Sequence, residues 1–416
     1  MKGPLSERSI FRILIGLAMT LGAATVGSAA TLHVSTTGND SNNCLTPASA
    51  CQKIQAAVNK AANGDTINVA PGTYAEVVSI VERDNLSVIG SPGVFITHPG
   101  VNNSPARFVL QVLVSRNIGF ANLTITGLPE TDGVRVFNTT LAEFTNCTVE
   151  GNGGPGGAFF TSASSVSLSD CTVQDNGTGI RVDGNASVDL NSTPFSNGVS
   201  TVQRNGAGVI VRAGVFFLHG AGVIQENGVG ITGQGGAIKT CCNVGLRKII
   251  NNDTGILLRG DNLDLRGPVL MEGNRLFALR MFGGFATVGQ GVTVRSSGTA
   301  AGAAIYVTGG FIQLGGRFPG DIAISDNPGN GVTLTDGAAA RVFNTLISNN
   351  AGQGMRVQAL SSVELFDTAV MSGNRGFDFS CTPNSSARGS DLGVKRMFCP
   401  GFDKSPDPAP GGPDNP

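Results

Sequence analysis

Four side chains that can carry a charge or exchange a proton lie in three successive apolar–polar alternating segments. His219 follows "VFFL" and Lys239 lies in "AIKT". Asp264 and Arg266 lie in "LDLRG". If the side chains face a common ligand, Lys239 or Arg266 could remove a proton beside a carboxylate group while His219 assists. The alternative is an exposed ion pair between Lys239 and Asp264, which would contribute little to stability.

The acidic side chains of this part of the chain are too widely spaced for two other kinds of site. Asp189 and Asp264 are three repeats apart, or about 14 Å at about 4.8 Å per strand. Glycoside hydrolysis needs two carboxyl groups about 5–9.5 Å apart, and a calcium ion holds its ligands at about 2.3–2.6 Å. The sequence has no H-E-x-x-H or paired C-x-x-C pattern either. We therefore expect no metal site and no cofactor.

An asparagine recurs along most of the chain at intervals of 22 to 29 residues, with one interval of 53. The long interval equals two units in which one asparagine is missing. A period in the twenties with strand-like content is typical of a solenoid. The leucine-rich frame L-x-x-L-x-L-x-x-N, which has a similar period, is not found. The recurring residues are Asn152, Asn176, Asn205, Asn227, Asn252, Asn274, Asn327, Asn350 and Asn374.

Each repeat contains three short runs of alternating apolar and polar residues, separated by Gly, Asn and Asp. In one repeat the runs are "SVSLSD", "CTVQ" and "GIRV". This pattern indicates strands and turns, and helical periodicity ends at about residue 63. The sequence therefore predicts an all-β fold, a right-handed parallel β-helix with three strands per coil and a short N-terminal capping helix. The residues expected to face inward in this repeat are Val166, Leu168, Cys171, Val173, Ile180 and Val182.

The recurring asparagine predicts a ladder of stacked side-chain amides at one corner of the coil. We expect a tight turn between the second and third strands, with a backbone conformation that asparagine tolerates and neighbouring glycines relieve. Stacked amides hydrogen-bond to one another and add to the backbone pairing of parallel sheets.

The N-terminal capping helix is predicted from Ile54, Ala57, Val58 and Ala61, which share one helical face. Gly64 is expected to end this helix.

The segment that precedes the repeats resembles the opening of secreted bacterial β-helix proteins of the pectin-lyase-like superfamily. The likeness rests on "VSTTGNDSNNC" and "CQKIQAAVNKAANGDTINVAPGTYAEVVSI", and the repeats extend it over nearly all of the mature chain. The superfamily includes pectate lyases, polygalacturonases, alginate epimerases, phage tailspikes and surface adhesins. The fold alone does not select one of these functions.

The resemblance implies a groove along the outside of the first sheet, for which Asp189, Phe217 and Arg341 are binding candidates. Calcium-dependent lyases of the superfamily gather acids on adjacent coils, unlike this sequence, so calcium is expected only if the protein is a lyase. His219 in "FLHGAG" is similar to the G-H-G of polygalacturonases, but the aspartate pair expected before it is missing. The row predicted to face outward is Ser167, Asp189, Phe217, Lys239, Asp264, Gln313, Arg341 and Glu364.

Composition and the N-terminus indicate an exported chain. The net charge of −1 among 416 residues gives no electrostatic reason to expect nucleic acid or an anionic membrane as partner. A basic start, the apolar run "ILIGLAMTLGAATVG" and "SAA" before Thr31 form a signal peptide. We expect no membrane span after its removal. The predicted segments are the signal peptide (1–30), a cap with helix and first strand (31–72), the β-helix (73–383) and a C-terminal segment with a disordered Pro-rich tail (384–416).

The chain has 8 cysteines, and an exported protein is expected to oxidise some of them. Cys44 with Cys51, and Cys381 with Cys399, are expected to form disulfides near the two ends. Cys147 and Cys171 occupy the same position in consecutive coils. A disulfide between them is an alternative, but we favour two buried free thiols. Cys241 and Cys242 are adjacent in the sequence, and free thiols are favoured there because a vicinal bridge needs strained geometry.

Two functions remain open on the sequence. The first is an exported β-helix protein that presents a long surface to a polysaccharide or another cell-envelope or extracellular partner, with no catalytic activity evident. The alternative is a polysaccharide lyase or glycoside hydrolase acting on uronic-acid polymers. The lack of Trp favours the first, because carbohydrate grooves usually offer aromatic faces to sugar rings. We expect a monomer of about ten to twelve coils.

Overall fold

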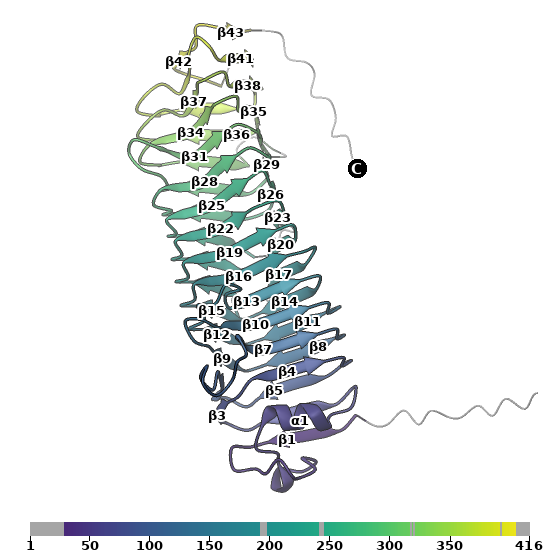
Figure 1. Cartoon of the computed structure of the whole chain (residues 1–416). Helices are drawn as coiled ribbons and strands as arrows, with labels where there is room; N and C mark the ends of the chain where they lie inside the picture. Colours follow the sequence, from purple (N-terminus) through teal and green to yellow (C-terminus); the bar gives the residue numbers. More distant parts are fainter. Residues whose placement is uncertain are drawn as a thin grey trace, which may run out of the picture.

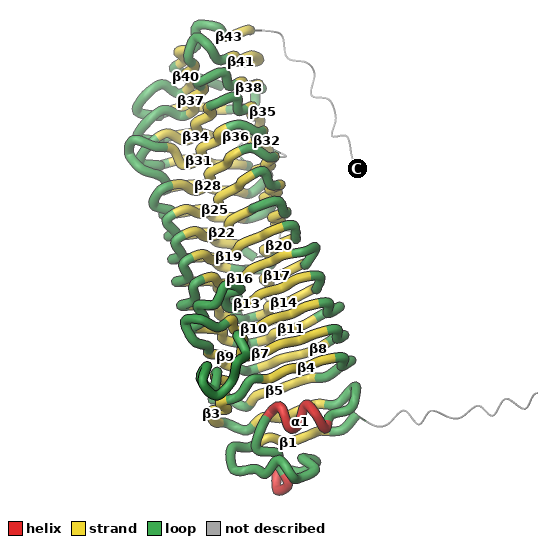
Figure 2. Tube along the Cα trace, viewed as in Figure 1, coloured by secondary structure: helices red, strands yellow, loops and turns green. Residues whose placement is uncertain are grey.

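The computed structural model describes residues 29–191, 198–240, 245–316, 318, 321–391 and 393–404. In these residues the chain winds into one long solenoid whose coils follow each other in chain order, from the purple end to the yellow end of Figure 1. Within the described part of the chain, helix occurs near the N-terminal end, in η1 (Pro47–Ser49) and α1 (Ile54–Lys60), red in Figure 2. The predicted right-handed parallel β-helix with three strands per coil is confirmed.

In the described residues most coils contribute one strand to each of three parallel sheets, named here in the order in which the chain visits them. The first sheet has 16 strands: β1 (Thr31–Val34), β2 (Thr66–Val69), β5 (Ser87–Gly90), β8 (Ile118–Ala121), β11 (Ala142–Thr145), β14 (Ser165–Ser169), β17 (Ser187–Asn191), β20 (Val215–Leu218), β23 (Ala237–Thr240), β26 (Asn262–Leu265), β29 (Phe285–Val288), β32 (Phe311–Gly315), β35 (Ala339–Phe343), β38 (Ser362–Leu365), β41 (Ser386–Gly389) and β43 (Phe402–Asp403).

The second sheet has 13 strands: β3 (Gly72–Ala75), β6 (Val94–Thr97), β9 (Thr124–Thr126), β12 (Thr148–Glu150), β15 (Thr172–Gln174), β18 (Thr201–Gln203), β21 (Val223–Gln225), β24 (Arg247–Ile250), β27 (Val269–Glu272), β30 (Val292–Arg295), β33 (Ile322–Ser325), β36 (Thr345–Ser348) and β39 (Val370–Ser372). The third sheet has 14 strands: β4 (Val78–Val81), β7 (Phe108–Leu113), β10 (Asp132–Phe137), β13 (Phe159–Ser162), β16 (Thr178–Asp183), β19 (Ala207–Arg212), β22 (Val229–Gly233), β25 (Thr254–Arg259), β28 (Phe277–Phe282), β31 (Ala303–Thr308), β34 (Asn330–Thr335), β37 (Met355–Val357), β40 (Phe379–Cys381) and β42 (Met397–Phe398).

The solenoid is longer than the ten to twelve coils expected from the repeat. The second sheet alone has 13 strands, and the first sheet begins with β1. Coiling starts well before the first ladder asparagine: Thr66 of β2 pairs with Ser87 of β5, one turn later. At the other end, β41 to β43 continue two of the sheets beyond residue 383.

Inward side chains from all three sheets fill the interior of the solenoid, and their packing keeps the coils in register. The six residues expected to face inward in the repeat around Cys171 are all buried. Aromatic rings stack from coil to coil: the ring centroids of Phe120 and Phe144 are 4.7 Å apart, and Phe144 meets Phe159 edge-on at 5.1 Å. A slip of one residue would turn every inward side chain to solvent, so the apolar pattern fixes which side chains face outward.

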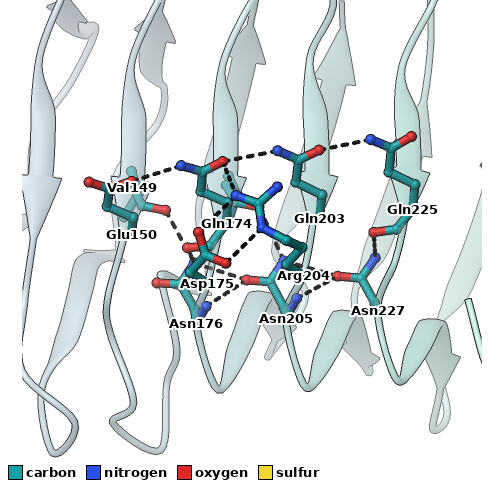
Figure 3. Close-up of polar contacts among 11 residues, drawn as sticks. Val149, Glu150, Gln174, Asp175, Asn176, Gln203, Arg204, Asn205, Gln225 and Asn227 are labelled. Carbon is teal, nitrogen blue, oxygen red and sulfur yellow. Dashed lines mark hydrogen bonds and ion pairs between the residues drawn. The ribbon is translucent and has the colours of Figure 1, made fainter.

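The asparagine ladder is confirmed at the corner between the second and third sheets. The backbone N and Nδ2 of Asn176 both donate to Oδ1 of Asn205, at 3.0 and 2.9 Å. Asn205 donates to Asn227 in the same way, at 3.0 Å for both bonds. Nδ2 of Asn205 also donates to the carbonyl oxygen of Val173 at 3.1 Å. Each buried amide therefore satisfies backbone groups of the corner as well as its neighbour (Figure 3).

The expected reason for asparagine at this corner needs one correction. The left-handed backbone belongs to the residue just before each ladder asparagine, as in Gly151 (φ 71°), Asp175 (φ 57°) and Glu226 (φ 56°), and not to the asparagine itself. The asparagine is needed for its amide, because a hydrogen-bond donor and an acceptor are both required at a buried corner. Glycines that precede a ladder asparagine, such as Gly151, provide positive φ, but glycines that follow one, such as Gly177, do not.

Ser297 occupies the ladder position that the sequence showed as missing. Its side chain is buried. Its Oγ lies 3.2 Å from the backbone N of Asn274, which donates to it, and its own backbone N donates to Oδ1 of Asn327 at 3.0 Å. The ladder therefore continues through the long interval with a hydroxyl in place of an amide.

The N-terminal end of the solenoid is covered by α1, which packs against β1, β2 and β4. Ile54, Ala57 and Val58 are its buried residues, as predicted. The helix ends at Lys60 and not at Gly64, because Ala61 already has an extended backbone (φ −66°, ψ 139°). Gly64 lies in the following turn with φ 92°. The amides of Ile54 and Gln55 donate to the two carboxylate oxygens of Glu76, at 2.8 and 2.9 Å.

Both expected disulfides are present, Cys44–Cys51 and Cys381–Cys399. Cys147 and Cys171 are buried free thiols, as favoured from the sequence. The adjacent pair Cys241 and Cys242 lies outside the described residues, as do residues 1–28 of the expected signal peptide and residues 405–416 of the expected tail. No helix in the described part of the chain is both long and apolar enough to cross a membrane.

Candidate functional site

The outward row predicted on the first sheet is a continuous line of side chains in register. Asp189 pairs with Phe217, Phe217 with Lys239, and Lys239 with Asp264, each on the next coil. The expected separation of three coils between Asp189 and Asp264 is therefore correct. The outer-row residues in order are Glu143, Ser167, Asp189, Phe217, Lys239, Asp264, Thr287, Gln313, Arg341, Glu364 and Arg388.

Asp189, Phe217 and His219 form a compact cluster on this face. Nδ1 of His219 lies 2.9 Å from the carboxylate of Asp189 on the preceding coil. The rings of Phe217 and His219 are 5.2 Å apart and tilted by 31°. The Asp189 and His219 side chains are 32% and 24% exposed, so both border solvent. A carboxylate in this position orients the imidazole and favours the tautomer with hydrogen on Nδ1.

The strand alternation by itself could not reveal this contact. His219 follows the last residue of β20, where the chain leaves the sheet, and the corner turns its ring back toward the previous coil. Asp189 and His219 are 30 residues apart in the sequence. Their meeting depends on the lengths of the corners between the strands.

The ion pair expected between Lys239 and Asp264 is not formed. Oδ1 of Asp264, in β26, instead accepts a hydrogen bond at 2.7 Å from Nε of Arg266, which follows the end of that strand. Arg266 lies two residues away and reaches the carboxylate without crossing to another coil. Lys239 is exposed and stands in register between Phe217 and Asp264. The four catalytic candidates thus share one face but do not converge on one point.

Arg341, a predicted binding residue, is held by one acidic neighbour on the same row. Its Nε donates to Oε2 of Glu364 at 2.8 Å, and Nη2 of Arg388 donates to Oε1 of the same carboxylate at 3.0 Å. Glu364 is only 14% exposed, so it is shared between two arginines from adjacent coils. The guanidinium group of Arg341 is therefore only partly neutralised, because one carboxylate serves two arginines.

The sequence reasoning missed two features of the first sheet. Thr287 fills the row between Asp264 and Gln313, in a coil that has no ladder asparagine nearby. Phe285 and Phe311 lie beside the row with their rings stacked at 5.4 Å. Both phenylalanines follow a pair of glycines, as "GGF", and this repeated turn signal could have placed them at the start of first-sheet strands.

The outer face of the second sheet carries a different kind of row, in which side chains bind each other (Figure 3). Nε2 of Gln174 donates to Glu150 at 2.8 Å, and Gln203 and Gln225 continue the chain of hydrogen bonds at 2.9 and 2.8 Å. Arg204 adds contacts to Asp175 and Gln174. These polar groups have their hydrogen-bond partners within the row, so this face has fewer groups available for a ligand.

Groups of three or more His, Cys, Asp or Glu side chains that could hold a metal ion are not found among the residues that the structure describes. In the outer row of the first sheet, Glu143 and Asp189 are two coils apart with Ser167 between them, and Asp189 and Asp264 are separated by Phe217 and Lys239. Nothing in this arrangement gathers oxygen ligands around one point.

A family model agrees with the architecture. The family model described as "Right handed beta helix region" matches residues 104–243. The sequence has no match among curated proteins. Among solved structures, the chain is similar to the A-module of the Azotobacter vinelandii mannuronan C-5 epimerase AlgE6, with 15% identity, a TM-score of 0.36, and coverage of 85% of this chain and 94% of that one.

Two further similar structures have other titles. Pectin methylesterase from carrot has 14% identity and a TM-score of 0.35, covering 71% of this chain and 85% of that one. Tailspike protein 3 of bacteriophage CBA120 has 11% identity and a TM-score of 0.36, covering 84% of this chain and 57% of that one. At these identities the likeness concerns the fold.

Proposed function

We propose that this protein is exported and that the outer row of its first sheet binds an extended polysaccharide or another cell-envelope partner without cleaving it. The observation that carries the proposal is the row itself, which runs in register from Glu143 to Arg388 and offers one outward side chain per coil. A linear polymer laid along the solenoid would contact many coils at a regular spacing of about 4.8 Å.

The chemistry of the row supports binding more than cleavage. The carboxylates of Asp264 and Glu364 are paired with arginines, and Asp189 holds His219. No two carboxylates of the outer row lie on adjacent coils, so the paired acids of a glycoside hydrolase have no counterpart there. Phe217, half-buried beside His219, offers a ring face, and the C–H groups of a sugar ring favour the electron-rich face of an aromatic ring.

Export is supported by the two disulfides at opposite ends of the solenoid, Cys44–Cys51 and Cys381–Cys399. Disulfides form and persist in oxidising compartments such as the periplasm and the cell exterior. The signal peptide expected from residues 1–30 agrees with this location. Mass spectrometry of the mature protein from the native host's envelope or medium tests it, and an intact N-terminus in a cytoplasmic fraction would contradict it.

The binding proposal is tested by calorimetry with pectate, alginate and a neutral glucan, together with an assay for unsaturated and reducing ends. We expect saturable binding of at least one polymer and no new ends. Phe217→Ala should weaken that binding about fivefold, since an aromatic contact contributes about 1 kcal/mol. Gln225→Ala, on the second sheet, is the matched control and should bind like the wild type. Absence of binding to every polymer, or equal binding by Phe217→Ala, would overturn the proposal.

One observation favours a second candidate, a lyase acting on uronic-acid polymers. The contact of 2.9 Å between Asp189 and His219 is the geometry of a carboxylate-oriented general base. Under this candidate His219 would remove the proton beside the uronate carboxylate. Unsaturated ends that appear with the wild type and disappear with His219→Gln would establish it. Assays with and without added calcium decide whether the ion takes part.

A further inference from the structure

The third sheet carries a second outward cluster, far from the groups described above. Strand β28 presents Phe277, Arg280 and Phe282 on its outer side, and Tyr306 of β31 lies opposite Arg280 on the next coil. The guanidinium carbon of Arg280 is 4.7 Å from the ring centroids of both phenylalanines and 5.8 Å from that of Tyr306. Three aromatic rings from two coils thus surround one cation.

Among the residues that the structure describes, Arg280 has no acidic partner. It is half-buried, it takes part in none of the ion pairs between described residues, and its Nε is buried without a hydrogen-bond partner. A buried polar group that lacks a partner needs an explanation, and one explanation is a ligand that supplies the acceptor. Arg259, exposed on the preceding coil in register with Phe282, also has no ion-pair partner within the described chain.

The same sheet contains two arginines that serve as an internal comparison. Arg135 lies 5.3 Å from the ring of Phe108, and Arg181 lies 4.7 Å from that of Phe160. Each also has its carboxylate: Arg135 pairs with Asp132 at 2.7 Å and Arg181 with Asp183 at 2.5 Å. Arginine over an aromatic ring is therefore a recurring surface feature of this sheet. Of the three arginines that lie over rings on this sheet, Arg280 is the one for which the described residues supply no carboxylate partner.

We propose that Phe277, Arg280, Phe282 and Tyr306 form a subsite for a sugar unit that carries a carboxylate, such as a uronic acid. The guanidinium group would bind the carboxylate, and Arg259 would add positive charge at the rim. The rings of Phe282, 37% exposed, and Tyr306 would contact the sugar ring. This subsite rests on the proposed polysaccharide binding, because that function supplies the polymer. It lies on the third sheet, however, and uses none of the residues of the outer row on the first sheet.

The composition of the chain provides a local probe for this subsite. The protein has no Trp and only 2 Tyr. The other tyrosine, Tyr74, is 4% exposed in the N-terminal part of the solenoid, where its hydroxyl donates to the carbonyl of Ala70 at 2.8 Å. In a Tyr74→Phe background, tyrosine fluorescence reports on Tyr306 alone, so ligand contact at the subsite can be followed without labels.

The experiment titrates the Tyr74→Phe protein with glucuronate, glucose and glucose 6-sulfate while tyrosine emission is recorded. We expect a saturable change with glucuronate and none with glucose over the same concentration range. Arg280→Gln should weaken glucuronate binding about tenfold, which corresponds to one charge-assisted contact. Arg181→Gln is the matched control, because it removes an arginine over a ring that already has an acid partner, and it should bind like the parent. Phe282→Leu provides a second test if Arg280→Gln folds poorly, and it should also weaken binding.

The outcomes separate the subsite from the general function. Equal responses to glucose and glucuronate, a stronger response to the sulfate, or unchanged binding by both Arg280→Gln and Phe282→Leu would overturn the subsite. Polymer binding that depends on Phe217 but not on Arg280 would leave the first-sheet proposal standing and reject this one. Glucuronate binding that depends on Arg280, in a protein that binds no polymer, would leave the subsite standing and reject the first-sheet proposal.

Discussion

The backbone N and Nδ2 of Asn374 both donate to Oδ1 of Asp378, at 3.1 and 2.8 Å. Each ladder asparagine donates a hydrogen bond to the next ladder residue toward the C-terminal end. No ladder asparagine follows Asn374, so its acceptor must come from another residue. Asp378 supplies it, and its Oδ2 accepts from the backbone N of Arg396 at 3.1 Å. A carboxylate, which only accepts hydrogen bonds when ionised, is suited to the end of a row of donors.

Asp378→Ala should therefore destabilise the C-terminal coils. The substitution removes the acceptor of two buried N–H groups of Asn374, and such groups cost about 1–3 kcal/mol each when they are left unpaired. We expect the unfolding free energy of the last coils to fall by about 3 kcal/mol, measured by hydrogen exchange of β37 to β42 under native conditions. Asp367→Ala, at an exposed position, is the control and should have little effect. A similar loss in both variants would contradict the role of Asp378.

Ser297→Asn should stabilise the protein by completing the ladder. The serine hydroxyl accepts from the backbone of Asn274 but does not receive Nδ2 of that residue, which donates to the carbonyl of Ile249 at 2.9 Å. An asparagine would add side-chain bonds toward both neighbours, and each net hydrogen bond contributes about 1 kcal/mol. Urea denaturation should show a gain of about 1 kcal/mol. Ser325→Asn, on the outer face of β33, should give none. An unchanged or lower midpoint for Ser297→Asn would show that the corner there cannot accept the amide.

Stability should depend on pH through Glu76, at the start of the capping helix. Burial raises the pKa of Glu76 above its ordinary value, even though the amides of Ile54 and Gln55 favour the carboxylate. The folded protein then holds this proton more tightly than the unfolded chain does. The stabilisation is complete below the pKa of the unfolded chain and is lost as pH rises through the raised folded pKa. Glu76→Gln removes this titration while it keeps one acceptor.

Denaturation of the wild type and Glu76→Gln at a series of pH values from about 4 to about 7 measures this effect. The wild type should lose more stability over that interval than the variant does. Glu130→Gln, which changes an exposed carboxylate, should follow the wild type. Parallel curves for the wild type and Glu76→Gln would mean that Glu76 titrates alike in the folded and unfolded chain.

The Cys381–Cys399 disulfide should stabilise only the C-terminal end. It closes a loop with a sequence separation of 18 residues, for which chain entropy predicts about 3 kcal/mol. Because each coil contacts mainly its neighbours, the effect should stay local. In Cys381→Ala/Cys399→Ala, hydrogen exchange should accelerate in β41 to β43 and remain unchanged in β14. Cys44→Ala/Cys51→Ala is the matched variant at the other end, and it should leave β41 to β43 protected. Accelerated exchange along the whole solenoid would contradict a local effect.

The alternation of side chains was sufficient to predict the fold and the direction of most side chains. In a parallel strand a residue faces either the core or the solvent, so "SVSLSD" and its counterparts assign Val166 and Leu168 inward and Ser167 outward without further information. The recurring asparagine then sets where each coil begins again. These two periodicities together placed Asp189, Phe217, Lys239 and Asp264 in one row, and the register confirms it.

The partners of those side chains were decided only by the tertiary structure. Asp264 binds Arg266 and not Lys239, Asp189 binds His219, and Arg280 lies among three rings with no acid. The core dictates that these groups point outward, but it does not dictate which neighbour a long side chain reaches. That choice depends on corner lengths and side-chain rotamers, which the repeat period does not determine, as with the 30 residues between Asp189 and His219.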